Sequence, residues 1–245
     1  MPKVLRMIDK TDDFRIDKPG GLWSLPMRIA LVGRTGAGKT ALLGNLLLRD
    51  ELYKGDFKPE NIFIISGSLK GDAKLKTIIK QLDVPKSNLF DRYDPAVLDG
   101  IYEELMDRYN EAIEEGENPE HSLIVLDDVS YTGRLAAVNA KDDPLLRIAM
   151  NSRKFLVSLI VTGQKYSQIA TALRENLSGA MIGQSTNKQI DLIEADWNRL
   201  PTKKEFFAMF RRQTPNSHDY LVLNHEDPAL YLDMEWRALP DLRQG

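Results

Sequence analysis

Residues 33–40 read Gly-Arg-Thr-Gly-Ala-Gly-Lys-Thr, and this stretch decides the fold of the 245-residue chain. It follows the apolar run Met27–Val32 and precedes the apolar run Ala41–Leu48, which is the strand–loop–helix setting of a phosphate-binding loop. Glycines let the backbone wrap around phosphate oxygens, so that N–H groups and the helix N-terminus point at the anion. The sequence therefore predicts a nucleoside triphosphate site formed by Gly33, Arg34, Thr35, Gly36, Ala37, Gly38, Lys39 and Thr40.

Two side chains of this loop have specific predicted roles. Lys39 is expected to reach the β- and γ-phosphates, and the Thr40 hydroxyl is expected to bind Mg²⁺. A dinucleotide-binding loop is the competing interpretation, and it requires an acidic residue about 20 positions further on. The next strand-like run instead ends in Ser66-Gly67-Ser68, which favours ATP with Mg²⁺.

Composition limits the class of protein. Apolar residues make up 42% of the chain, which is enough for a core, and cysteine is absent, which excludes disulfides and Cys-type zinc sites. The net charge of −3 gives no global basic field for nucleic acid. The longest apolar stretch, Phe155–Val161, is too short to cross a bilayer, and no signal peptide is apparent, so we expect a soluble intracellular protein without a transmembrane segment.

Short apolar runs alternate with helical patterns, which indicates an α/β domain with a mostly parallel sheet and helices on both faces. The C-terminal part predicts a β-hairpin from Tyr220–Leu223 and Leu230–Met234. We therefore divide the chain into an ATPase core with its N-terminal segment, 1–212, and a hairpin extension, 213–245; Leu22-Trp23 is expected to pack beneath the sheet. The expected strands are Arg28–Val32, Ile62–Ser66, Leu123–Leu126, Leu156–Thr162 and Ala180–Gly183, and the expected helices, besides Ala41–Leu48, are Ala96–Glu115, Pro144–Phe155, Ser167–Asn176 and Lys188–Trp197.

Polar residues at two strand ends complete the predicted catalytic site. The strand beside the loop is expected to end in Asp127, which would hold Mg²⁺, and Asp128 would activate the attacking water. Gln164, after a later strand, would sense the γ-phosphate at the edge where α/β ligands bind. An added strand, Ile62–Ser66, is expected between the loop strand and the Asp strand, as in ATPases that carry their own catalytic carboxylate.

Arginine can stabilise the charge that develops during phosphoryl transfer, from the same subunit or from a neighbour. Arg147, Arg153 and Arg174 lie near the elements that flank Gln164, and we expect at least one of them to act as such a finger; the family resemblance described next implies Arg153 and Arg174.

Taken together, Gly33–Thr40, Leu123–Asp128, Val161–Tyr166 and Leu173–Asn176 resemble the FtsK–HerA superfamily over roughly residues 22–184. The pattern is most similar to the compact genome-packaging ATPases of poxviruses, other large double-stranded DNA viruses, virophages and some membrane-containing phages. The resemblance implies an ATP-hydrolysing homo-oligomeric ring, usually a hexamer, that drives double-stranded DNA into a capsid. It also implies capsid or vertex proteins as partners and a location in the host cytoplasm, a viral factory or the virion. Asp128 stands where Glu is common in the wider superfamily.

Other interpretations remain open at this point. A GTPase switch would need Asn-Lys-x-Asp, but the chain has Asn187-Lys188-Gln189-Ile190. A small-molecule kinase, a cellular or conjugative DNA translocase of the same superfamily, and a structural ring subunit without turnover are the further alternatives. If the chain is a DNA motor, the basic segments Lys70–Lys86 and Arg199–Arg212 are expected to grip DNA phosphates, and the hairpin Tyr220–Met234 is a candidate capsid-docking element.

Overall fold

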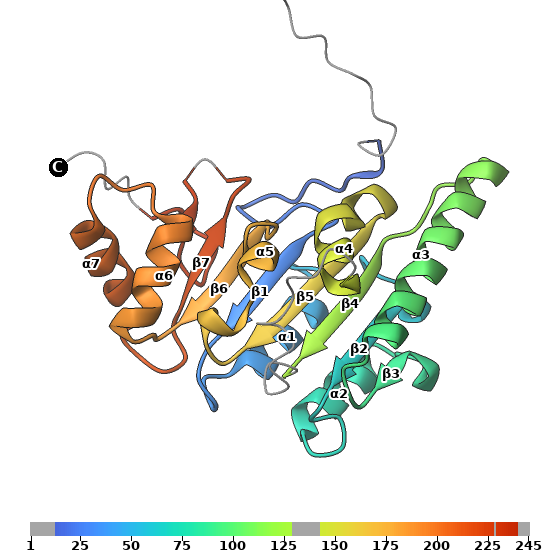
Figure 1. Cartoon of the computed structure of the whole chain (residues 1–245), viewed down its shortest axis with the longest axis horizontal. Coiled ribbons are helices and arrows are strands. Elements are labelled where there is room, and N and C mark those ends of the chain that lie inside the picture. The colour runs from blue at the N-terminus through green and yellow to red at the C-terminus, as the bar shows by residue number, and fades with distance from the viewer. Residues whose placement is uncertain (1–12, 129–142, 228, 240–245) are drawn as a thin grey trace, which may run out of the picture.

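The computed structural model describes residues 13–128, 143–227 and 229–239. One eight-stranded sheet dominates it, with the strand order β3-β2-β4-β5-β1-β6-β7-β8 (Figure 1). The first six strands in this order are parallel to their neighbours, and β7 and β8 are antiparallel. The strands are β1 Arg28–Val32, β2 Ile62–Ser66, β3 Leu89–Phe90, β4 Ser122–Asp127, β5 Val157–Gly163, β6 Gly179–Gly183, β7 Tyr220–Asn224 and β8 Tyr231–Leu232.

Helices cover both faces of the sheet. In the view of Figure 1, α4, α5 and α6 lie in front of the sheet and α1 lies behind it. The helices are α1 Lys39–Leu48, α2 Ala73–Gln81, α3 Pro95–Glu115, α4 Pro144–Asn151, α5 Thr171–Arg174, α6 Asn187–Trp197 and α7 Lys203–Gln213, with the 3₁₀ turns η2 Pro59–Asn61, η3 Lys86–Asn88, η6 Ser152–Phe155 and η7 Tyr166–Gln168.

The alternating side chains of the strands build two apolar cores. On β1, Ile29 and Leu31 pack against α1 and α2, whereas Ala30 and Val32 pack against the layer formed by α3, α4, α6 and α7. Because both faces are covered, the central strands are largely apolar, as expected of a parallel sheet, and Ser158 and Thr162 of β5 are buried polar exceptions. The carboxyl ends of β1, β4 and β5 meet at one edge of this sheet, and that edge positions the site described below.

Side-chain caps explain where three helices begin. The carboxylates of Asp72, Asp94 and Asp143 accept hydrogen bonds from backbone N–H groups in the first turns of α2, α3 and α4. Such caps satisfy donors that a helix start leaves without partners. At its other end, α3 stops at Gly116, which adopts the left-handed conformation typical of a helix terminus.

The α/β class, the parallel strands, the long helices and the terminal hairpin agree with the prediction, and Trp23 is fully buried against the sheet as expected. Three expectations were wrong. The expected helix Pro144–Phe155 is divided, because α4 ends at Asn151 and Ser152–Phe155 form the 3₁₀ turn η6. The strand between the loop strand β1 and the Asp strand β4 is β5, whereas β2 lies beyond β4. The region 167–176 is not one helix, because Ala170 is extended and separates η7 from α5.

The C-terminal hairpin is joined to the main sheet. β7 pairs with β6 over five residues, Gly179↔Asn224 to Gly183↔Tyr220, and all of its residues are buried. Trp23 covers this junction, since its indole N–H donates to the Leu223 carbonyl at 3.0 Å. Across the described ranges, no helix combines the length and the apolar character needed to cross a membrane.

Candidate active site

The phosphate loop connects β1 to α1, and its backbone depends on a glycine at the helix start. Gly38 has a φ of 94° at the N-cap of α1, and a Cβ there would lie 3.3 Å from His218. This conformation is the left-handed region that side chains disfavour. No side chain caps α1, so the first N–H groups of the helix are left for an anion. The strand–loop–helix geometry predicted for residues 33–40 is therefore present, and nucleotide binding by this loop stays a prediction.

Lys39 lies over this loop. Its ammonium donates to the Gly33 carbonyl at 2.8 Å. Partial burial lowers the Lys39 pKa from its ordinary value, and the nearby carboxylates of Asp128 and Asp127 oppose that shift. An ammonium held against a neutral carbonyl between carboxylates is placed to exchange that carbonyl for a phosphate oxygen.

A cavity of 590 Å³ opens beside the loop. Its lining combines the loop with the ends of β4 and β5 and with the first turn of α2. A volume of this size is typical of cavities that bind small molecules. The cavity brings together most of the predicted site residues, namely Thr35, Gly36, Gly38, Lys39, Thr40, Asp127, Asp128 and Gln164.

Asp127 closes β4 and is buried, with 3% of its surface exposed. The hydroxyls of Ser66 and Thr162 donate to its two carboxylate oxygens, each at 3.0 Å. Burial raises the Asp127 pKa above its ordinary value, and the two hydroxyl hydrogen bonds oppose the rise. A desolvated carboxylate with fixed oxygens has much to gain from a cation, because a cation compensates the lost hydration.

Asp128 follows directly and has a left-handed backbone, with φ at 50°. Its N–H donates to the Thr162 hydroxyl at 2.8 Å, so one threonine of β5 fixes both acidic residues. Such a conformation is uncommon outside glycine and is held here by the surrounding structure. The turn separates the two carboxylates, with Asp127 buried and Asp128 only partly buried at the cavity.

The residues present suit Mg²⁺ bound together with a nucleotide. Mg²⁺ is commonly held by one or two carboxylates and by substrate phosphates. Asp127 and Thr40 supply a carboxylate and a hydroxyl at the cavity, and the remaining positions would belong to phosphate and water. In the described part of the chain, no group of three His, Asp or Glu side chains forms a metal site without a nucleotide.

Asp72 is a site residue that the sequence reasoning missed. Its Oδ2 accepts a hydrogen bond from the Thr40 hydroxyl at 3.0 Å, while its Oδ1 caps α2. It lies after β2, and the carboxyl end of β2 faces the same edge as that of β4, with Ser66 paired to Asp127. The sequence Ser68-Leu69-Lys70-Gly71-Asp72 contained a helix-cap signal, but nothing in it pointed to the phosphate loop.

The C-terminal segment also contacts the loop. The Tyr220 hydroxyl donates to the Ala37 carbonyl at 3.0 Å, and a ring nitrogen of His218 lies 3.1 Å from the same oxygen. His218 lines the 590 Å³ cavity. No local motif indicates this contact, because His218 and Ala37 are 181 positions apart in the chain.

The candidate arginines lie away from the phosphate loop of their own chain. Arg153 is exposed on η6, before β5, whereas Gln164 follows the other end of that strand. Arg174 is buried, paired with Asp196, and donates to the Ile169 carbonyl. Arg147 is paired with Asp99 and Glu103 of α3. Because Arg174 is held inside the subunit, its position fits the packing of α5 against α6 better than a finger role.

No protein-family model matches the sequence, and no curated protein matches it either. Several solved structures are similar in fold. The genome packaging NTPase B204 from Sulfolobus turreted icosahedral virus 2 has a TM-score of 0.54 and 12% identity, with 82% of this chain and 93% of that chain covered. EssC (ATPases 2 and 3) from Geobacillus thermodenitrificans has a TM-score of 0.55 and 15% identity, with 82% of this chain and 38% of that chain covered.

The pCW3 conjugation coupling protein TcpA gives a TM-score of 0.54 and 13% identity, with 98% of this chain and 71% of that chain covered. B204 structures contain AMP, AMPPCP or ATP-gammaS, and the TcpA structure contains ATPgS. At these identities the likeness establishes the fold, and it confirms the predicted structural resemblance to a viral packaging ATPase.

Proposed function

We propose that this protein is an ATP-hydrolysing DNA translocase that packages a double-stranded DNA genome into a viral capsid. The observation that carries the proposal is the convergence of Lys39, Thr40, Asp127, Asp128 and Gln164 on one cavity. The same fold occurs in the B204 packaging NTPase, which this chain matches over 93% of that protein's length. An acidic pair, a polar strand end and a phosphate loop at one cavity suit hydrolysis of ATP.

In the proposed reaction each group has one role. Lys39 and the loop N–H groups bind the β- and γ-phosphates, and Thr40 and Asp127 hold Mg²⁺, which neutralises phosphate charge when bound. Asp128 accepts the proton of the attacking water, and Gln164 orients that water against the γ-phosphate. Positioned proton transfer of this kind contributes about 10²- to 10⁴-fold to a rate.

The ring and the finger belong to the same proposal. Arg153 is exposed at the edge of the sheet opposite the phosphate loop, so it could act only on the site of a neighbouring subunit. We therefore retain Arg153 as the finger of a homo-oligomeric, hexameric ring. Capsid or vertex proteins are the proposed partners, and the host cytoplasm or viral factory, with the virion, is the proposed location.

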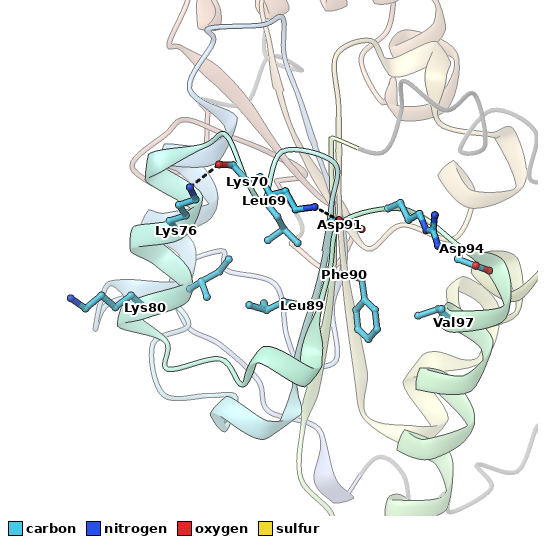
Figure 2. Close-up of a pocket in the computed structure, with 11 residues that line it drawn as sticks. Leu69, Lys70, Lys76, Lys80, Leu89, Phe90, Asp91, Asp94 and Val97 are labelled. Carbon is cyan, nitrogen blue, oxygen red and sulfur yellow. Dashed lines mark hydrogen bonds and ion pairs between the residues drawn. The ribbon is translucent and has the colours of Figure 1, made fainter.

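The lysines of the segment Lys70–Lys86, on α2 and on either side of it, are the proposed DNA contacts, and Figure 2 shows Lys70, Lys76 and Lys80 among them. Lys70 is paired with Asp91 at 2.7 Å, and the Lys76 ammonium donates to the Lys70 carbonyl at 2.7 Å. Lys70, Lys76 and Lys80 all line a 760 Å³ groove between α2, β3 and the start of α3. Lys74 and Lys80 are exposed and form no ion pair with a described carboxylate, so they are the better phosphate contacts.

A second candidate is a cellular or conjugative DNA translocase. The TcpA similarity favours it, because that structure matches 98% of this chain, including the C-terminal hairpin. Both candidates share ATP hydrolysis coupled to DNA, and they differ in the partner that receives the DNA.

The test is ATP hydrolysis with and without double-stranded DNA, for the wild-type protein and for Lys39→Ala and Asp128→Asn. We expect DNA to stimulate ATP hydrolysis by the wild-type protein. We expect each substitution to abolish this stimulated hydrolysis. A rate of ATP hydrolysis that DNA does not change would contradict the proposed DNA motor and favour the kinase or switch interpretation. Full activity of Asp128→Asn would remove Asp128 from the proposed role.

A further inference from the structure

Another cavity, of 730 Å³, adjoins the phosphate loop. It lies between the carboxyl ends of β5 and β6, the start of α6 and the end of α7. Gln164, Gln184 and Gln189 contribute amide groups to its wall, and Phe210 contributes an apolar surface. None of the roles assigned above uses this space, which we call the anion cavity.

The charge of the anion cavity has one sign. Its lining includes Arg34, Lys165, Lys188 and Arg211 and no Asp or Glu. Arg34 donates to the Gln184 amide oxygen at 2.8 Å, and Arg211 donates to the Asn187 amide oxygen at 2.7 Å, so neutral groups orient these two guanidinium groups.

Lys165 and Lys188 are exposed, and neither forms an ion pair with a carboxylate of the described ranges. Elsewhere, cations such as Arg147 and Arg237 have carboxylate partners. A concave surface with four uncompensated cations attracts and concentrates anions.

Two residues connect the anion cavity to the nucleotide. Gln164 lines both this cavity and the 590 Å³ cavity that holds Lys39 and Asp128. Arg34 belongs to the phosphate loop itself and reaches into the anion cavity. A ligand here would therefore contact the proposed γ-phosphate sensor from one side while ATP contacts it from the other.

We propose that the anion cavity binds backbone phosphates of DNA and that Gln164 and Arg34 transmit this binding to the nucleotide site. The assignment rests on the proposed DNA motor. All four cationic residues are exposed, so their charges extend to the mouth of the cavity, where a large polyanion can reach them. A small free phosphate shares the chemistry but gains most from enclosed, desolvated cations.

The test compares a Lys165→Gln/Lys188→Gln double variant with Lys154→Gln as a matched control. Lys154 is also an exposed lysine without a described carboxylate partner, but it precedes β5 at the opposite edge of the sheet. Each protein is saturated with Mg²⁺ and a non-hydrolysable ATP analogue, and its affinity for a fluorescein-labelled DNA duplex is measured at several salt concentrations. Loss of two phosphate contacts should weaken binding and reduce the slope of log affinity against log salt by about two. The control should match the wild type.

Three outcomes would overturn the assignment. If the wild type binds DNA and the double variant has the same affinity and salt slope, the cavity is not a DNA site, while the motor proposal stands. If the wild type does not bind DNA, the proposed function itself fails, and the cavity loses its occupant. Inorganic pyrophosphate is titrated in parallel with the nucleotide site filled. Pyrophosphate binding that the double variant loses, with DNA affinity unchanged, would identify a free-phosphate site instead.

Discussion

The hydroxyl of Thr162 joins the two acidic residues of the candidate site, since it donates to Asp127 and accepts from the Asp128 N–H. Thr162→Val keeps the shape of the side chain and removes both hydrogen bonds. We expect the free energy of unfolding to fall by about 1–3 kcal/mol, because buried polar groups lose their partner. Urea denaturation measures the change.

Thr77→Val is the control, because Thr77 is exposed on α2 and its hydroxyl donates a hydrogen bond to the Ala73 carbonyl. It should change stability by less than about 0.5 kcal/mol. Equal effects of the two substitutions would show that Thr162 has no special role in holding the acidic turn.

Asp72 is a second single residue that we expect to support the site, because its carboxylate accepts a hydrogen bond from the Thr40 hydroxyl. Asp72→Asn preserves the helix cap, since Asn caps as well as Asp. Groups that orient a metal ligand typically affect metal affinity by about 10- to 100-fold. We therefore expect Asp72→Asn to weaken the affinity for Mg²⁺ by about 10-fold or more. The affinity is measured from the Mg²⁺ dependence of binding a fluorescent ATP analogue. Asp94→Asn alters the equivalent cap of α3 and should leave that dependence unchanged; the same loss in both variants would argue against a role at the site.

His121 gives a pH dependence. It is buried, its Nε2 lies 2.8 Å from the Phe14 carbonyl, and burial lowers its pKa. Between the ordinary value of about 6.5 and the lowered value, the unfolded chain binds a proton that the native state does not. Stability should therefore fall as the pH drops through this window. In His121→Gln, the free energy of unfolding should fall less between about pH 7.5 and pH 5.5 than it does in the wild type, as measured by urea denaturation. An identical pH profile in the two proteins would contradict this interpretation.

At the scale of elements, the start of β6 has room for hydrogen only. A Cβ at Gly179 would lie 1.7 Å from the Trp23 indole nitrogen and 2.5 Å from the Leu223 carbonyl. Gly179→Ala must displace Trp23 or β7, and overpacking of this kind costs about 1–3 kcal/mol or more. Gly100→Ala is the matched control, because Gly100 is inside α3 with no atom within 4 Å of the added Cβ. It should stabilise by about 0.5–1 kcal/mol. Urea denaturation measures the free energy of unfolding of both variants. A Gly179→Ala variant as stable as the wild type would mean that the junction is not tightly packed.

For the whole molecule, the main question is whether residues 213–245 are an extension or part of the core. β7 is buried, pairs with β6 and places Tyr220 against the phosphate loop. We expect a chain that ends at Gln213 to lose cooperative thermal unfolding and nucleotide binding, because the edge of β6 and two apolar cores would be exposed. A truncated chain with an unchanged melting temperature and nucleotide affinity would support the division at 212/213.

Local signals in the sequence were sufficient for the strand–loop–helix at the phosphate loop, the strand end at Asp127-Asp128, five of the parallel strands, and the bounds of α3 and α6 to within one residue, whereas α2, α7 and β3 were not expected. Their determinants act over short distances: glycine conformations, apolar runs and helix caps such as Asp94. The tertiary structure alone decided that β5 separates β1 from β4 and that Asp72 reaches Thr40. It also decided that Tyr220 supports the loop and that four distant cations share one cavity. These features depend on strand order and crossover paths, which bring together residues far apart in the chain, and no local pattern encodes such contacts.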